Sequence, residues 1–160
     1  MKNEIHDFNA DLDNSTKNYD KAITKLNKYF KTKFNKSELE LDKMGSDIND
    51  GVIHIDIKDN TIGKNPYSSK NIIIEFDGWT CDKTNITDYI YWLCTDIDLL
   101  IDYKKLRDFC IEKEEMLKRV GDKRYMNNVK DGRKYTVPIY VMPMWIFNDC
   151  IVARTKQKGA

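Results

Sequence analysis

The sequence predicts a single domain of the α/β class, with some α+β character, in which a central mixed β-sheet is flanked by helices. Three observations predict it: an amphipathic helical pattern comes first, several short β-rich segments follow, and a second helical pattern precedes the last strand. A chain of 160 residues is long enough for one domain with its own core. We therefore expect one domain over residues 17–153, after a loose segment at 1–16 and before a disordered tail at 154–160.

The helices are predicted from apolar side chains that recur every three or four residues. Residues 18–34 have such a stripe, with lysines on the other face. A second helix is expected within 103–120, and Pro143 is well placed at the start of a third. The stripe of the first helix consists of Tyr19, Ala22, Ile23, Leu26, Phe30 and Phe34.

The strands are predicted from short apolar runs bounded by turn residues. Asn49-Asp50-Gly51 is a tight-turn signal, so residues 48–58 are expected to form a β-hairpin. Further strands are expected within 71–76, 87–96, 98–102 and 136–142, although the run at 87–96 also fits a helix. The polar residues 121–135 form either a loop or a hairpin.

The second strand of the hairpin alternates apolar and polar residues. Ile53, Ile55 and Ile57 share one face, which is expected to be core. His54, Asp56 and Lys58 share the other face. A turn centred on Asp50 and Gly51 would set Asp47 opposite His54 and diagonal to Asp56.

Two carboxylates and an ammonium group would then lie together. Asp47 and Asp56 could hold a divalent cation that prefers oxygen ligands, Mg²⁺ or Mn²⁺, as phosphodiester hydrolysis requires. Lys58 could orient the attacking water or stabilise developing negative charge. The alternative is an ordinary solvated strand face, because Asp and Lys are frequent in this chain and an exposed pair contributes little.

The stretch from Gly45 to Lys58 resembles the PD-(D/E)XK nuclease superfamily, especially its small phage-borne members. Asp47 matches the first acid of the motif, and Asp56-Ile57-Lys58 matches its (D/E)-x-K triplet. The similarity extends over roughly residues 18–117 and implies a metal-dependent nuclease that hydrolyses nucleic-acid phosphodiester bonds. Asp47 is not preceded by proline, and the nine-residue step from Asp47 to Asp56 requires a tight hairpin.

Four further residues are candidates for this site. Glu75 lies in an otherwise apolar run, and a buried carboxylate needs a metal, a cation or several donors, so it is the preferred third acid and metal ligand. A structural ion pair is its alternative. Asp20, Asp42 and His54 are auxiliary candidates, and their alternatives are a solvated helix residue, a turn residue and a structural hydrogen-bonding residue.

The positive charge is concentrated in residues 118–134. This segment has seven basic and two acidic residues, whereas the whole chain has a net charge of +1. Such a segment could bind a phosphate backbone, or it could be a solvated loop. The basic residues, our candidates for nucleic-acid binding, are Lys118, Arg119, Lys123, Arg124, Lys130, Arg133 and Lys134.

We expect a cytoplasmic protein, from the spacing of the cysteines and from the N-terminal sequence. The four cysteines are widely spaced, which is typical of reduced thiols and poor zinc spacing. No signal peptide and no membrane-spanning run is expected. The expected partner is nucleic acid, DNA rather than RNA, and a homodimer is left open.

A different class of function remains open beside the nuclease. The same fold could be a catalytically inactive binding module, for example a phage protein that blocks a host factor. A DNA-binding protein that uses only the basic surface is a third alternative. Dependence on a divalent metal distinguishes the nuclease from both.

Overall fold

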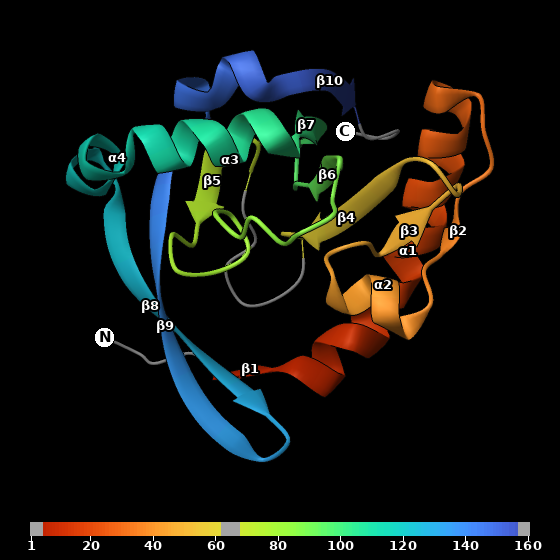
Figure 1. The fold of residues 1–160 in the computed structure, drawn as a ribbon. Helices are drawn as coiled ribbons and strands as arrows, with labels where there is room; N and C mark the ends of the chain where they lie inside the picture. The colour runs from red at the N-terminus through yellow and green to blue at the C-terminus, as the bar shows by residue number, and fades with distance from the viewer. Residues whose placement is uncertain (1–4, 62–67, 157–160) are drawn as a thin grey trace.

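The computed structural model describes residues 5–61 and 68–156 and has the expected α/β architecture, a single domain with a mixed sheet and flanking helices (Figure 1). In chain order, its elements are β1 (Ile5–Asp7), α1 (Phe8–Phe30), β2 (Asn35–Lys36), α2 (Leu39–Lys43), β3 (Ile48–Asn49), β4 (His54–Asp59), β5 (Asn71–Ile74), β6 (Tyr89–Leu93), β7 (Ile97–Asp102), α3 (Tyr103–Glu112), α4 (Glu114–Val120), β8 (Asp122–Lys130), β9 (Arg133–Pro143), the 3₁₀ helix η1 (Met144–Cys150) and β10 (Ile151–Lys156). No helix among these residues is both long and apolar enough to cross a membrane.

The larger sheet has six strands in the order β10-β7-β6-β4-β3-β2. β4 and β6 run parallel and the other neighbours run antiparallel, so this sheet is mixed. β4 lies inside the sheet, between β3 and β6, and its Ile55 and Ile57 are 0% and 4% exposed. Ile55 and Ile57 are therefore confirmed as core, whereas Ile53, expected on the same face, lies in the loop before β4 and is only partly buried.

α1 packs its apolar stripe on this sheet. Ala22 and Leu26 are buried in one cluster with Ile55, Ile57 and Tyr91, as the helical periodicity predicts. Burial of a side chain such as Leu26 contributes about 1.5–3 kcal/mol to the stability of the fold.

An ion pair also joins α1 to the sheet. Asp98 on β7 is 1% exposed, and its Oδ2 accepts hydrogen bonds from the Lys25 ammonium at 2.7 Å and the Tyr91 hydroxyl at 3.1 Å. The buried carboxylate thus has a counter-ion, which a buried charge requires. This contact fixes the position of the helix along the sheet.

The smaller sheet has the order β1-β8-β9-β5 and contains a long hairpin. β8 and β9 pair from Asp122 with Val141 to Lys130 with Arg133. Their two-residue turn, Asp131-Gly132, has φ values of 51° and 73°, and positive values at both positions are typical of the turn that matches strand twist. In Figure 1 this hairpin extends away from α3 and α4 toward the bottom of the view.

Two terminal segments differ from the sequence-based expectation. Residues 5–16, expected to be loose, form β1 and the first turns of α1. Residues 154–156, expected in a disordered tail, complete β10, in which Arg154 and Thr155 pair with Leu99 and Asp98. Polar sequence misled the expectation because the edges of a sheet tolerate polar side chains. Residues 1–4 and 157–160 lie outside the described part.

Candidate functional site

The Asp47 backbone is positioned by the turn that joins α2 to β3. Gly45 has a φ of 98°, and a Cβ atom at this position would lie 2.3 Å from Asn85 Oδ1, so only glycine fits. The Thr87 hydroxyl donates a hydrogen bond to the Gly45 carbonyl. These contacts with residues 85–87 hold the chain just before Asp47.

The register of β3 and β4 differs from the prediction. Asn49 pairs with His54 and Ile48 with Ile55, so the loop comprises residues 50–53. Asp50 Oδ1 accepts hydrogen bonds from the amides of Val52 and Ile53 at 2.9 and 2.7 Å, which stabilises this wider loop. Asp47 comes just before this ladder: its amide donates a hydrogen bond to the Ile55 carbonyl at 3.0 Å, so it lies next to Asp56 and not opposite His54.

Asp47 is tied to β4 and to α1. Its Oδ2 atom accepts a hydrogen bond from the Ile57 amide at 2.7 Å and one from the Tyr19 hydroxyl at 3.2 Å. Burial, and then the Asp56 carboxylate, raise the pKa of the Asp47 carboxyl to about 8. The two facing carboxylates therefore repel each other, although the Lys58 ammonium and the Ile57 amide partly offset the effect.

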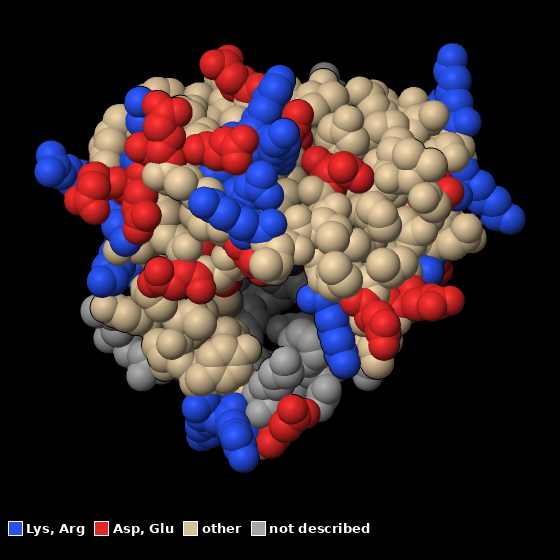
Figure 2. All heavy atoms as spheres, viewed as in Figure 1, with Lys and Arg blue, Asp and Glu red and all other residues tan. Residues whose placement is uncertain are grey.

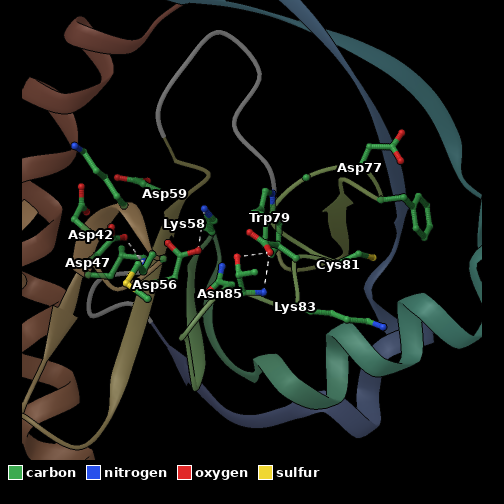
Figure 3. Close-up of a pocket in the computed structure, with 18 of the residues that line it drawn as sticks. Asp42, Asp47, Asp56, Lys58, Asp59, Asp77, Trp79, Cys81, Lys83 and Asn85 are labelled. Atoms are coloured by element: carbon green, nitrogen blue, oxygen red, sulfur yellow. Dashed lines mark hydrogen bonds and ion pairs between the residues drawn. The ribbon is translucent and has the colours of Figure 1, made fainter. Parts of the chain in front are cut away.

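Asp56 and Lys58 lie on the same face of β4 and form an ion pair. Lys58 Nζ is 2.9 Å from Asp56 Oδ2, and their side chains are 32% and 7% exposed. Burial opposes the charged form of Lys58, but the carboxylates of Asp56 and Asp47 outweigh it and raise the pKa of the Lys58 ammonium. Figure 3 shows these side chains together, as the two-residue alternation predicts.

The group lies in an open cleft of about 1140 Å³. One wall comes from α1, the α2–β3 turn and β4, and the other from residues 76–85. Trp79 belongs to the second wall, and the Lys58 ammonium lies 4.8 Å from the centroid of its ring (Figure 3). A cation over an indole face is stabilised there, so Trp79 fixes the position of Lys58.

Glu75 is held apart from the paired aspartates. Its carboxylate accepts a hydrogen bond from Trp79, and burial raises its pKa against the opposing effect of Lys58. A Cβ atom on Gly78 would lie 2.4 Å from Glu75 Oε2, so the turn closes tightly over this carboxylate. In residues 5–61 and 68–156, no group of three or more His, Cys, Asp or Glu side chains is placed to hold a metal ion. Glu75 thus does not complete a three-acid site with Asp47 and Asp56.

Of the three auxiliary candidates, Asp42 lies at the cleft, whereas the side chains of Asp20 and His54 are directed elsewhere. Asp42 lines the cleft, and its side chain adds to the effects that raise the pKa of Asp47. Asp20 does not reach the cleft, because its side chain is 77% exposed and pairs loosely with Lys36 at 3.9 Å. His54 is also directed elsewhere, since its Nδ1 lies 3.0 Å from the Ser46 hydroxyl.

The seven basic candidates do not form one loop. Lys118 and Arg119 belong to α4, and the other five belong to the β8–β9 hairpin. Two of them have acidic partners, because Lys118 pairs with Glu114 and Arg124 Nη2 lies 2.8 Å from Asp122 Oδ2. Asp122 and Arg124 are two residues apart on one strand and so share a face.

Sequence reasoning missed three residues of the cleft. Tyr19 is part of the apolar stripe of α1, where its hydroxyl gave no sign of a polar role. Lys43 and Lys83 are exposed cations that line the cleft. In the sequence, both lie nearer to Asp47 and Asp56 than the basic residues of the β8–β9 hairpin do. Only the short distance from Lys43 to Asp47 in the sequence could have indicated one of them.

A pH effect on stability follows from the Asp47 environment. Because its folded-state pKa lies above that of an exposed carboxyl, the folded protein binds the extra proton, and its free energy of unfolding should fall as pH rises from about 4 to 8. Asp47→Asn retains an oxygen for the Ile57 amide and has no charge. We expect its stability relative to the wild type to grow over this range, by up to about 1.4 kcal/mol per pH unit.

Urea denaturation at a series of pH values, without divalent metals, measures this effect. Asp20→Asn is the matched control, because the same change at an exposed site should give no such trend. A constant stability difference between Asp47→Asn and wild type from pH 4 to 8 would show that Asp47 ionises normally.

Comparisons with known proteins add no relative. A scan against protein-family models, a search of curated proteins and a search of solved structures each return no match. The geometry of the cleft therefore provides the evidence on function.

Proposed function

We propose that this protein is a metal-dependent nuclease that hydrolyses phosphodiester bonds in nucleic acid, with an active site of the PD-(D/E)XK type. One observation carries the proposal: the Asp47 carboxylate accepts a hydrogen bond from the Ile57 amide, next to Asp56, and a partly buried ammonium group pairs with Asp56 in the same open cleft. The spacing of Asp56 and Lys58 and the position of Asp47 agree with the resemblance of residues 45–58.

The acids fit a magnesium or manganese ion. Both offer carboxylate oxygens, the donors that such ions prefer, and Mg²⁺ commonly uses one or two carboxylates together with water and substrate phosphate. Two acids without Glu75 are therefore compatible with this ion. Burial and the Asp56 carboxylate raise the pKa of Asp47, and a bound cation would oppose both effects.

Each residue has a distinct role. Asp47 and Asp56 would hold the ion, which would supply a Lewis acid for the scissile phosphate and a bound water of lowered pKa. Lys58 orients the attacking water or stabilises the charge that develops on the phosphate oxygens. Trp79 keeps the Lys58 ammonium in place, and Glu75 acts through its electrostatic effect on Lys58.

Metal-dependent cleavage tests the proposal. Purified protein should cleave single-stranded or double-stranded DNA, or RNA, in the presence of Mg²⁺ or Mn²⁺ and should not cleave in EDTA. We expect Mn²⁺ to restore activity after EDTA treatment. Ca²⁺ should support it poorly, because Ca²⁺ takes longer bonds and more ligands than this acid pair provides.

Absence of both cleavage and metal binding would contradict the proposal. Folded protein that cleaves none of these substrates with any metal, and binds no Mn²⁺ in calorimetry, would contradict the proposal. The Asp56–Lys58 pair would then be a structural ion pair, and the fold would be an inactive binding module, for example one that blocks a host protein.

A further inference from the structure

One face of the β8–β9 hairpin joins the cleft through a series of aromatic contacts. Phe76 lines the cleft, and its ring meets that of Tyr140 edge to face, with centroids 5.3 Å apart. Tyr140 pairs with Lys123 in the hairpin, and the Lys123 ammonium lies 5.4 Å from the centroid of Tyr125. The contacts run without interruption from the cleft to Tyr125.

The same face continues along the hairpin with polar and basic side chains. Residues two apart on a strand share a face, and so do residues paired across an antiparallel ladder. Tyr125 is therefore followed by Asn127 and its partner Thr136, whose side chains are joined by a 2.8 Å hydrogen bond, and then by Lys134. We call the set Phe76, Lys123, Tyr125, Asn127, Lys134, Thr136 and Tyr140 the hairpin track.

The hairpin track has two lysines and no acidic residue, and it is exposed beyond its buried members Phe76 and Tyr140. Asp122 is the one acidic residue in the sequence of β8 and β9, and it lies on the opposite face with Arg124. Lys123 and Lys134 are exposed, and Tyr125 is 62% exposed. Figure 2 shows Lys and Arg side chains at the bottom of the view, at the free end of the hairpin, with an acidic side chain beside them.

An exposed tyrosine beside a lysine has a specific use in nucleic-acid binding. Every unpaired base has a π-face that can stack on an aromatic ring, whereas the bases of a duplex are already stacked inside it. Lysines on either side of the ring can neutralise the flanking phosphates. Burial in the protein core does not account for a tyrosine with this exposure.

We propose that the hairpin track binds single-stranded nucleic acid and guides it to the cleft, with a base stacked on Tyr125 and phosphates on Lys123 and Lys134. This inference rests on the proposed nuclease function and names the substrate class of the same site. Cleavage then occurs on the strand that leaves the track past Phe76.

Tyr135 provides a matched control for Tyr125. It lies in the same hairpin, pairs with Asn128 on the opposite face and is 46% exposed. Binding of fluorescein-labelled oligothymidylate, measured by anisotropy in EDTA, should weaken about 5- to 100-fold in Tyr125→Ala, because one base stack is lost. Tyr125→Phe should bind like wild type, and Tyr135→Ala should bind within about twofold of it.

The lysines allow a second matched comparison. Lys123→Gln with Lys134→Gln should reduce the slope of log affinity against log salt by about 1.4, the value for two phosphates of a single strand. Lys28→Gln with Lys36→Gln, two exposed lysines outside the hairpin, should leave the slope unchanged. Melting curves of all variants check that the hairpin is intact.

Other outcomes test separately the hairpin track, the form of nucleic acid bound and the nuclease function. Equal losses in Tyr125→Ala and Tyr135→Ala, or no loss in either, would overturn the hairpin track. Tighter binding of a duplex of the same length, unaffected by Tyr125→Ala, would show that the β8–β9 hairpin binds in a groove of the duplex instead. Wild-type protein that binds the oligonucleotide but cleaves nothing with Mn²⁺ would refute the nuclease and leave the track supported.

Discussion

Asp56→Asn should lower the cleavage rate by at least about a hundredfold at any practical Mg²⁺ concentration. The neutral amide is a far weaker ligand for a hard cation than the carboxylate it replaces. It also removes the repulsion with Asp47, so the pKa of Asp47 should fall. The variant has nearly the same shape and lies on the polar face of β4, so the Ile55 and Ile57 core is retained.

Initial cleavage rates at increasing Mg²⁺, with a melting curve for each protein, measure this effect. Asp20→Asn is the control, because its exposed carboxylate does not line the cleft and should leave the rate unchanged. Equal rates for Asp56→Asn and wild type would mean that the activity belongs to a contaminating nuclease or to another site.

Lys58→Met should slow the chemical step about 10²- to 10³-fold while metal binding persists. Methionine retains contact with the Trp79 ring but has no charge to stabilise the transition state. Removing the ammonium also frees Asp56 Oδ2, so the affinity for Mn²⁺ should be equal to or higher than that of the wild type. The loss should therefore appear in kcat.

Single-turnover cleavage and Mn²⁺ calorimetry separate the two effects. Lys36→Met is the control, since Lys36 is half exposed and lies outside the cleft lining. Loss of Mn²⁺ binding in a folded Lys58→Met protein would show that the lysine organises the acids and has no separate catalytic role.

The sequence predicted the chemistry of β4 better than the geometry around it. Alternation alone sets Asp56 and Lys58 on one face and Ile55 and Ile57 on the other, because a strand has a fixed two-residue period. The partner of Asp56 was predicted less well. The Asp50 side chain closes a four-residue loop, and the changed register pairs Asn49 with His54 and brings Asp47 next to Asp56.

The sequence also did not show which side chain of α1 reaches the cleft. Successive helical residues are rotated by about 100°, so Tyr19 points to Asp47 while Asp20 points to solvent. The sequence marks Asp20 as the functional candidate because it is charged. Only the docking of the helix on the sheet decides which flank of the stripe reaches the cleft.

The long hairpin was left open as a loop or a hairpin, although its Asp131-Gly132 turn is a strong local signal. Its strands are polar on both faces along much of their length, so apolar alternation could not identify them. Its relation to the cleft depends on the contact of Phe76 with Tyr140, which are 64 residues apart. No local pattern contains that information.

The most direct test of the metal site is to locate Mn²⁺ by anomalous diffraction in crystals grown above about pH 8, where Asp47 should be ionised. We expect one strong peak with oxygens of Asp47 and Asp56 at about 2.0–2.2 Å, and loss of that peak in Asp56→Asn crystals. A peak elsewhere, or no peak in the cleft with the Asp56–Lys58 ion pair intact at saturating Mn²⁺, would contradict it.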